Sequence, residues 1–116
     1  MTAAAIEQNL YGINEELIQE ITARIVRDWH PHKVILFGSF AWSKPKSHSD
    51  LDLFIVMDST IARPDMRAMQ IKKRLRDFDC PKDLVAYTPD EVEMCLKKQN
   101  PFIRDVLTKG RVLYAR

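Results

Sequence analysis

The sequence has little of what marks several common protein classes. It contains two cysteines, Cys80 and Cys95, and three histidines, His30, His32 and His48. The cysteines have no CxxC spacing and no histidine stands at ligand spacing from them, which argues against a zinc site. No apolar run approaches the length of about 20 residues that a membrane-spanning helix needs. We therefore expect reduced thiols in or near a core and no membrane association.

An excess of charge of one sign is also missing. Eighteen Lys and Arg residues stand against sixteen Asp and Glu, a formal net charge of +2. The basic footprint of nucleic-acid-binding proteins is usually much stronger, so we expect no direct binding to nucleic acid. The N-terminus has no basic region followed by an apolar run, so a secreted protein is not expected and we predict a cytoplasmic one.

The length and composition indicate a single folded unit. The chain has 116 residues, 46% of them hydrophobic and 29% charged, and one core usually organises roughly 100–150 residues. Residues 1–12 show no clear periodicity of hydrophobic residues and are interpreted as an N-terminal arm, either loose or docked on a partner. Residues 13–116 are interpreted as one domain.

Local sequence patterns predict where the helices and strands lie. Helical spacing predicts a helix over about 14–29 with Asn14 as its cap, and another over 63–78 with Met66 and Met69 in the core and a solvated basic face. Caps followed by proline predict helix starts at Thr88 and Asn100. Strands are expected at 33–38, 50–57, 83–88 and, at the sheet edge, 111–115. The fold class is therefore α/β, a small mixed sheet with packed helices.

Two carboxylates carry the clearest chemical signal. Side chains at positions i and i+2 of a strand point to the same face, so Asp50 and Asp52 project together while Leu51 points away. Adjacent carboxylates repel each other unless a cation or a shared proton relieves them. Oxygen ligands at a strand end suit Mg²⁺, which retains water and also binds substrate phosphates.

Two further features complement this pair. Gly38 ends the preceding strand and permits close approach of a phosphate, while Ser39 opens a possible helical turn whose amide and hydroxyl can bind an anion. Asp83, at the start of the third strand, is the best candidate for a third carboxylate. Asp58 lies ~20 Å along the strand from Asp52 and cannot share its metal.

These residues resemble a known superfamily. The segments 34–42, 49–56, 83–91 and 106–114 are similar to those of nucleotidyltransferases related to DNA polymerase β, above all the minimal nucleotidyltransferases that partner HEPN-domain proteins. The spacing Gly38-Ser39, ten residues, Asp50-Leu-Asp52 is specific, and the likeness covers about 33–115.

The resemblance implies a polymerase-β-like fold and a defined chemistry. Asp50 and Asp52 would bind two Mg²⁺, Asp83 would be a shared ligand and possible base, and Gly38 and Ser39 would hold the triphosphate of ATP. Such proteins are often antitoxins that transfer AMP to a tyrosine of a HEPN ribonuclease toxin. Phe40 stands where many relatives have a basic residue, and we expect no counterpart of the helical acceptor domain of larger relatives.

Several alternatives stay open. The domain can instead be a binding module that neutralises its partner by contact, or a subunit that modifies an aminoglycoside hydroxyl. In the loop after the motif, Lys44, Lys46 and His48 are interpreted as solvated rather than as phosphate ligands. Trp42 is assigned to the core or a hinge in preference to stacking on a base.

Overall fold

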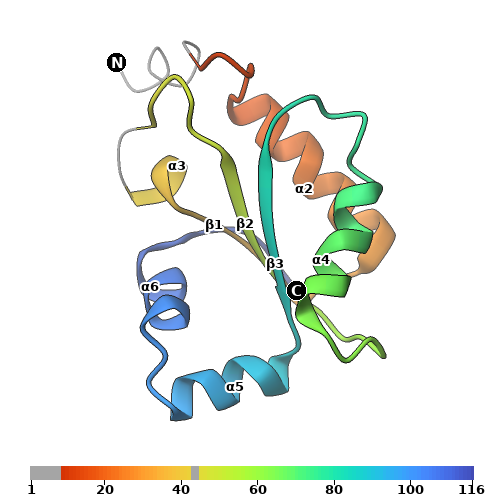
Figure 1. The fold of residues 1–116 in the computed structure, drawn as a ribbon, viewed down its shortest axis with the longest axis vertical. Helices are drawn as coiled ribbons and strands as arrows, with labels where there is room; N and C mark the ends of the chain where they lie inside the picture. The colour runs from red at the N-terminus through yellow and green to blue at the C-terminus, as the bar shows by residue number, and fades with distance from the viewer. Residues whose placement is uncertain (1–8, 43–44) are drawn as a thin grey trace.

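The computed structural model describes residues 9–42 and 45–116 and has helices on both faces of a four-stranded sheet (Figure 1). The elements follow the order α2 (Glu15–Trp29), β1 (Lys33–Phe37), α3 (Ser39–Trp42), β2 (Leu51–Val56), α4 (Pro64–Lys73), β3 (Lys82–Tyr87), α5 (Pro89–Lys97), α6 (Pro101–Lys109) and β4 (Arg111–Ala115). The strand order is β3-β2-β1-β4. β1 is antiparallel to β2 and β4, and β2 is parallel to β3. The predicted mixed α/β fold with β4 at an edge is confirmed.

Alternate residues of the central strands face two separate cores. On one face, residues such as Leu36, Leu53 and Ile55 pack with Ile21 and Ile25 of α2. On the other face, Ile35, Phe37, Phe54 and Val56 pack with Ile103 and Val106 of α6. Because β1 and β2 are buried on both faces, they are continuous apolar runs in the sequence.

Short polar side chains begin three of the helices as predicted. Asn14 Oδ1 accepts the backbone N–H of Leu17 at 2.9 Å. Thr88 and Glu91 form a capping box at α5, and Asn100 accepts the N–H groups of Phe102 and Ile103 at α6. Each cap satisfies helix N–H groups that have no partner within the helix. These caps explain why α5 and α6 begin where the sequence indicates.

The helix predicted over 63–78 differs from expectation. It ends at Lys73, and turns with i→i+3 bonds, such as Leu75 N–H to Lys72 O, lead to the buried Leu75. Met66 and Met69 are 41% and 49% exposed, so their core assignment was wrong. Arg67 and Ile71, four residues apart, face inward instead. The basic face is therefore not wholly solvated, because the side chain of Arg67 is only 3% exposed.

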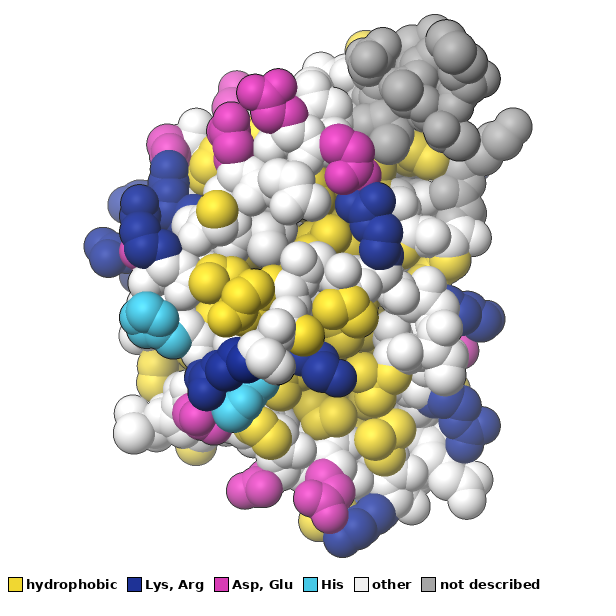
Figure 2. Space-filling model, turned by 180° about the vertical axis from the view of Figure 1, so that it is seen from behind, with side chains coloured by type: hydrophobic (Ala, Val, Ile, Leu, Met, Phe, Trp, Pro, Cys, Tyr) yellow, Lys and Arg dark blue, Asp and Glu magenta, His cyan; other side chains and the backbone are white. Residues whose placement is uncertain are grey.

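The outer surface combines apolar and basic groups. Seen from behind (Figure 2), apolar side chains gather in the middle of the face with Lys, Arg and His around them. The edge strand β4 is partly solvated, and Val112 is 55% exposed. Within residues 9–42 and 45–116, no helix has both the length and the apolar character needed to cross a bilayer.

Candidate functional site

Three acidic residues meet at one end of the sheet. Asp52 is the ladder partner of Phe37 on β1 and of Asp83 on β3. Asp50 stands one residue before β2, on the same parity as Asp52. Side chains of directly opposite residues in neighbouring strands share a face, so the carboxylates of Asp52 and Asp83 lie side by side. Asp58 lies beyond the opposite end of β2, where its Oδ1 is 3.0 Å from Nε2 of His32.

The carboxylates influence one another electrostatically. Burial foremost, together with the negative charges of Asp83 and Asp50, raises the pKa of Asp52 to about 6. Asp50 and Asp83 are exposed, whereas Asp52 is half-buried between them. Desolvation and like charge both disfavour an ionised carboxyl group. The fold therefore brings the three predicted acidic residues into one electrostatic cluster.

The neighbouring protein groups do not neutralise this cluster. In the part of the chain that the structure describes, no Lys, Arg or His forms an ion pair with Asp50, Asp52 or Asp83. Among the same residues, no three acidic, His or Cys side chains gather closely enough to hold a metal ion by themselves. The all-oxygen donor set and its uncompensated charge fit a hard divalent cation whose remaining ligands are water and substrate phosphate.

Gly38 fits closely against the central carboxylate. Its φ is +75°, a left-handed conformation that favours glycine, and a Cβ there would collide with Oδ2 of Asp52. The Gly38 carbonyl accepts the N–H groups of Ala41 and Trp42, both at 3.0 Å. Ser39 is the first residue of α3, which confirms the predicted helical turn. Gly38 and Ser39 thus lie next to Asp52, as the sequence motif indicates.

An aromatic group borders the carboxylates on the same face. Phe37, the partner of Asp52, contacts Trp42 with ring centroids 6.1 Å apart and Phe102 at 5.4 Å. Trp42 is 41% exposed and Phe102 is 40% exposed. The sequence pattern predicts a core or hinge position for Trp42 and gives no prediction for Phe102. The position of Phe102 depends on the packing of α6, so its sequence neighbours carry no signal for it.

The N-terminal segment contacts the loop before Asp50. The side chain of Asn9 is buried and donates to the carbonyls of Lys46 and Ser49, while its Oδ1 accepts the N–H of Tyr11 at 2.9 Å. Leu10 N–H donates to Ser47 O. Residues 1–8 of the predicted arm, and Lys44 in the loop, lie outside the described residues. Residues 9–12 are thus attached to the loop that leads to the carboxylates.

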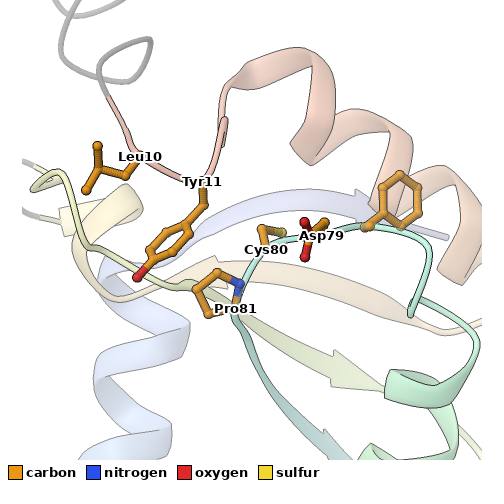
Figure 3. Close-up of a pocket in the computed structure, with 6 residues that line it drawn as sticks. Leu10, Tyr11, Asp79, Cys80 and Pro81 are labelled. Carbon is orange, nitrogen blue, oxygen red and sulfur yellow. The ribbon is translucent and has the colours of Figure 1, made fainter.

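A cavity opens beside the start of β3. Its volume is ≈ 630 Å³, and its lining includes Leu10, Tyr11, Asp79 and Pro81 (Figure 3). The Pro81 carbonyl accepts the N–H of Leu51, so this cavity adjoins the end of the sheet that carries the carboxylates. Asp50, Asp52 and Asp83 do not line it. It is a neighbouring surface rather than the carboxylate site.

Comparison with known proteins identifies the family. A family model described as polymerase beta, nucleotidyltransferase, matches residues 19–116. The fold resembles the crystal structure at 1.40 Å of a Sulfolobus solfataricus protein that its name assigns provisionally to the nucleotidyltransferases. That match has 18% identity and a TM-score of 0.63, and covers 100% of this chain and 89% of that one, which supports the fold alone. No curated protein sequence matches the chain. Because the family model spans most of the residues, the chain belongs to the polymerase beta nucleotidyltransferase family.

Proposed function

We propose that this protein transfers AMP from ATP to a hydroxyl group, that of a tyrosine on a HEPN-type toxin partner, and thereby acts as an antitoxin. The observation that carries the transferase part is the juxtaposition of Asp52 with Asp83 next to Gly38, in a half-buried position where none of the described basic residues forms an ion pair with it. Family members are nucleotidyltransferases, which generally use a nucleoside triphosphate and a divalent metal. The nucleotide, the acceptor and the antitoxin role come from the resemblance of the motif to minimal nucleotidyltransferases.

The position of each residue in the site determines the role that we propose for it. Asp50, Asp52 and Asp83 would hold Mg²⁺, which when bound supplies positive charge to the phosphates and the developing pyrophosphate. Gly38 lacks a Cβ and so lets the Asp52 carboxylate lie against its backbone, and Gly38 with Ser39 at the start of α3 would bind the triphosphate. Asp83 is exposed and accepts the proton of the attacking hydroxyl. The acceptor oxygen bonds to the α-phosphorus, and the bond from that phosphorus to the pyrophosphate oxygen breaks.

Label transfer tests the proposal directly. Purified protein is incubated with host extract, Mg²⁺ and ATP labelled at the α-phosphate, in parallel with Asp52→Asn. The matched control is Asp58→Asn, because Asp58 lies past the other end of β2. A labelled protein band that requires Asp52 but not Asp58, and whose mass identifies a HEPN protein, is the expected result. Label that persists in Asp52→Asn, or no protein label from folded enzyme with intact ATP, overturns the proposal.

A second function is favoured by one observation. Among the described residues, no three potential ligands form a preassembled metal cluster. A binding module would need the acidic residues only as contacts to a basic partner surface. Neutralisation of the toxin in cells by a variant with both Asp50→Asn and Asp52→Asn would favour this function, whereas restored toxicity would favour catalysis.

A further inference from the structure

Two exposed aromatic side chains share one buried support beside the carboxylates. Phe37 is 6% exposed and contacts both Trp42 of α3 and Phe102 of α6, the latter in an edge-on arrangement with an interplanar angle of 84°. Trp42 and Phe102 nevertheless leave about two-fifths of their surface in solvent. Trp and other aromatic side chains are enriched where a protein meets a ligand or a partner, so two such rings on one support beside an acidic site are suited to contact a ligand.

The ladder register locates this aromatic pair relative to the acidic site. Phe37 is directly opposite Asp52, and Phe54 is the next residue after Asp52 on the same face of β2. The Phe102 ring lies 6.4 Å from Phe54. Phe102 therefore stands over the row of side chains immediately next to the Asp52–Asp83 row.

The short helix α3 joins this aromatic surface to the phosphate side of the site. Ser39 is its first residue and Trp42 its last, three positions later. Residues three apart lie on the same side of a helical turn. A ligand whose phosphates reach Ser39 and Asp52 thus has Trp42 and Phe102 within the reach of its remaining part.

We propose that Trp42 and Phe102 form the subsite for the nucleobase of the bound nucleoside triphosphate. The inference rests on the proposed function in that it takes a nucleotide as the substrate. Stacking on an aromatic ring tolerates different bases, because every base has a π-face, and strengthens with ring area. The subsite therefore selects purine over pyrimidine nucleotides but discriminates weakly between adenine and guanine.

Tryptophan fluorescence reports on this subsite without any acceptor. The chain has two tryptophans, so Trp29→Phe leaves Trp42 as the single emitter, and Trp29 is on α2, which packs against the opposite face of the sheet. We titrate this variant with ATP, GTP, CTP and UTP in the presence of Mg²⁺, and with inorganic triphosphate as a probe that has no base. Saturable quenching by ATP and GTP, weaker quenching by the pyrimidines and none by triphosphate is expected. Equal responses to triphosphate and ATP overturn the subsite.

A variant of the second ring separates base stacking from general packing. Phe102→Leu keeps an apolar side chain against Phe37 and Phe54 but removes the stacking face. Phe78→Leu is the matched control, since Phe78 packs against the other core. Equilibrium dialysis with ATP and Mg²⁺ on the otherwise native chain is expected to show about tenfold weaker binding for Phe102→Leu and unchanged binding for Phe78→Leu. Equal ATP affinity in the two folded variants overturns the inference.

Transfer kinetics distinguish failure of the subsite from failure of the proposed function. With an acceptor, Phe102→Leu is expected to raise the KM for ATP about tenfold, with kcat within about twofold. A change in the KM for the acceptor alone would assign the rings to the acceptor and overturn the subsite. If nucleotide quenches Trp42 but no label transfer occurs with any acceptor, the subsite stands and the proposed transferase function fails.

Discussion

Two carboxylates of this protein, Glu91 and Asp52, have opposite surroundings. Glu91 accepts the guanidinium of Arg67, with Nη2 to Oε2 at 3.0 Å, and the backbone N–H of Thr88 at 2.8 Å. These contacts, the Arg67 bond foremost, hold the pKa of Glu91 below its usual value. Asp52 has two acidic neighbours instead, and its pKa rises to about 6, chiefly through burial.

The difference separates a carboxylate that an ion pair holds in place from one to which we assign a function only by proposal. Arg67 is almost fully buried and also donates to the carbonyls of Ile61, Ala62 and Ala86, so its contact with Glu91 ties α4, β3 and α5 together. Within residues 9–42 and 45–116, Asp52 has no such cation. A charge that the fold leaves uncompensated costs stability, and such groups concentrate at functional sites. This contrast is what supports our proposal that Asp52 binds a ligand, since residues 9–42 and 45–116 supply no counter-charge for it.

The largest expected effect concerns catalysis. Asp52→Asn removes the charge at the centre of the acidic cluster, and we expect the rate of label transfer to fall by a factor of about 10²–10³ or more. The melting temperature at pH 7 should not fall, because the variant also removes repulsion from Asp83 and Asp50. Initial rates and thermal unfolding of the same preparation check this. A variant that loses activity only because it unfolds would place Asp52 with Glu91 as a structural group.

The next effect concerns stability. Glu91→Ala leaves the buried Arg67 without its counter-charge, so we expect the free energy of unfolding to fall by about 3 kcal/mol. Glu93→Ala is the control, because Glu93 is exposed on the same helix and forms a surface ion pair with Lys97; its effect should stay within about 0.5 kcal/mol. Urea unfolding measures both. Equal effects of the two variants would show that the Arg67 contact contributes no more than a surface ion pair.

Local chemistry explains how much of the fold was predictable. The caps at Asn14, Thr88 and Asn100 act within three residues, and all three were read correctly from the sequence. The orientation of α4 was predicted wrongly, because Met66 and Met69 suggest an apolar face other than the one that is buried. The partner that buries Arg67, Glu91, is 24 residues away in the sequence. A long-range partner can make an arginine the better buried residue, and no local pattern shows this.

The candidate site, like the fold, was predictable only where neighbouring residues determine it. Asp50 and Asp52 share a face by strand parity alone, and the Gly38-Ser39 spacing is a sequence motif. That Asp83 lies opposite Asp52 depends on the parallel pairing of β2 with β3, whereas the resemblance named Asp83 as the third carboxylate without stating which strands pair. Asn9 and Phe102 were missed because their contacts with the loop before Asp50 and with Phe37 join segments that are distant in sequence. Their roles follow only from the folded chain.

A smaller effect is expected where the N-terminal segment holds the loop before the carboxylates. Asn9→Ala removes the donors to Lys46 O and Ser49 O, so the turn that places Asp50 loses its attachment. We expect about tenfold weaker activation of label transfer by Mg²⁺, as for the loss of groups that orient metal ligands. Asn14→Ala is the control, since it removes a helix cap at a cost of about 1 kcal/mol away from that turn. Equal Mg²⁺ activation in both variants would limit Asn9 to a structural role.

The smallest effect is a pH dependence whose sign differs between the two carboxylates. The pKa of Asp52 lies above its ordinary 3.8 in the folded protein, so its favourable contribution to stability is complete below about pH 4 and is lost as the pH rises through about 6. Without metal, Asp52→Asn should therefore be more stable than the wild type by about 1 kcal/mol at pH 7, a value reduced for the half-exposed position. This difference in stability should close toward pH 4.

Glu91 has a lowered pKa, so its ionised carboxylate stabilises the fold at neutral pH. Glu91→Gln should be less stable there, and its deficit should shrink only as the pH falls through that lowered pKa. Thermal unfolding in EDTA from pH 4 to 7 checks both: the gain of Asp52→Asn should close over this range while the deficit of Glu91→Gln persists above the lowered pKa, and stability changes of the same sign in the two variants would remove the distinction between the two sites.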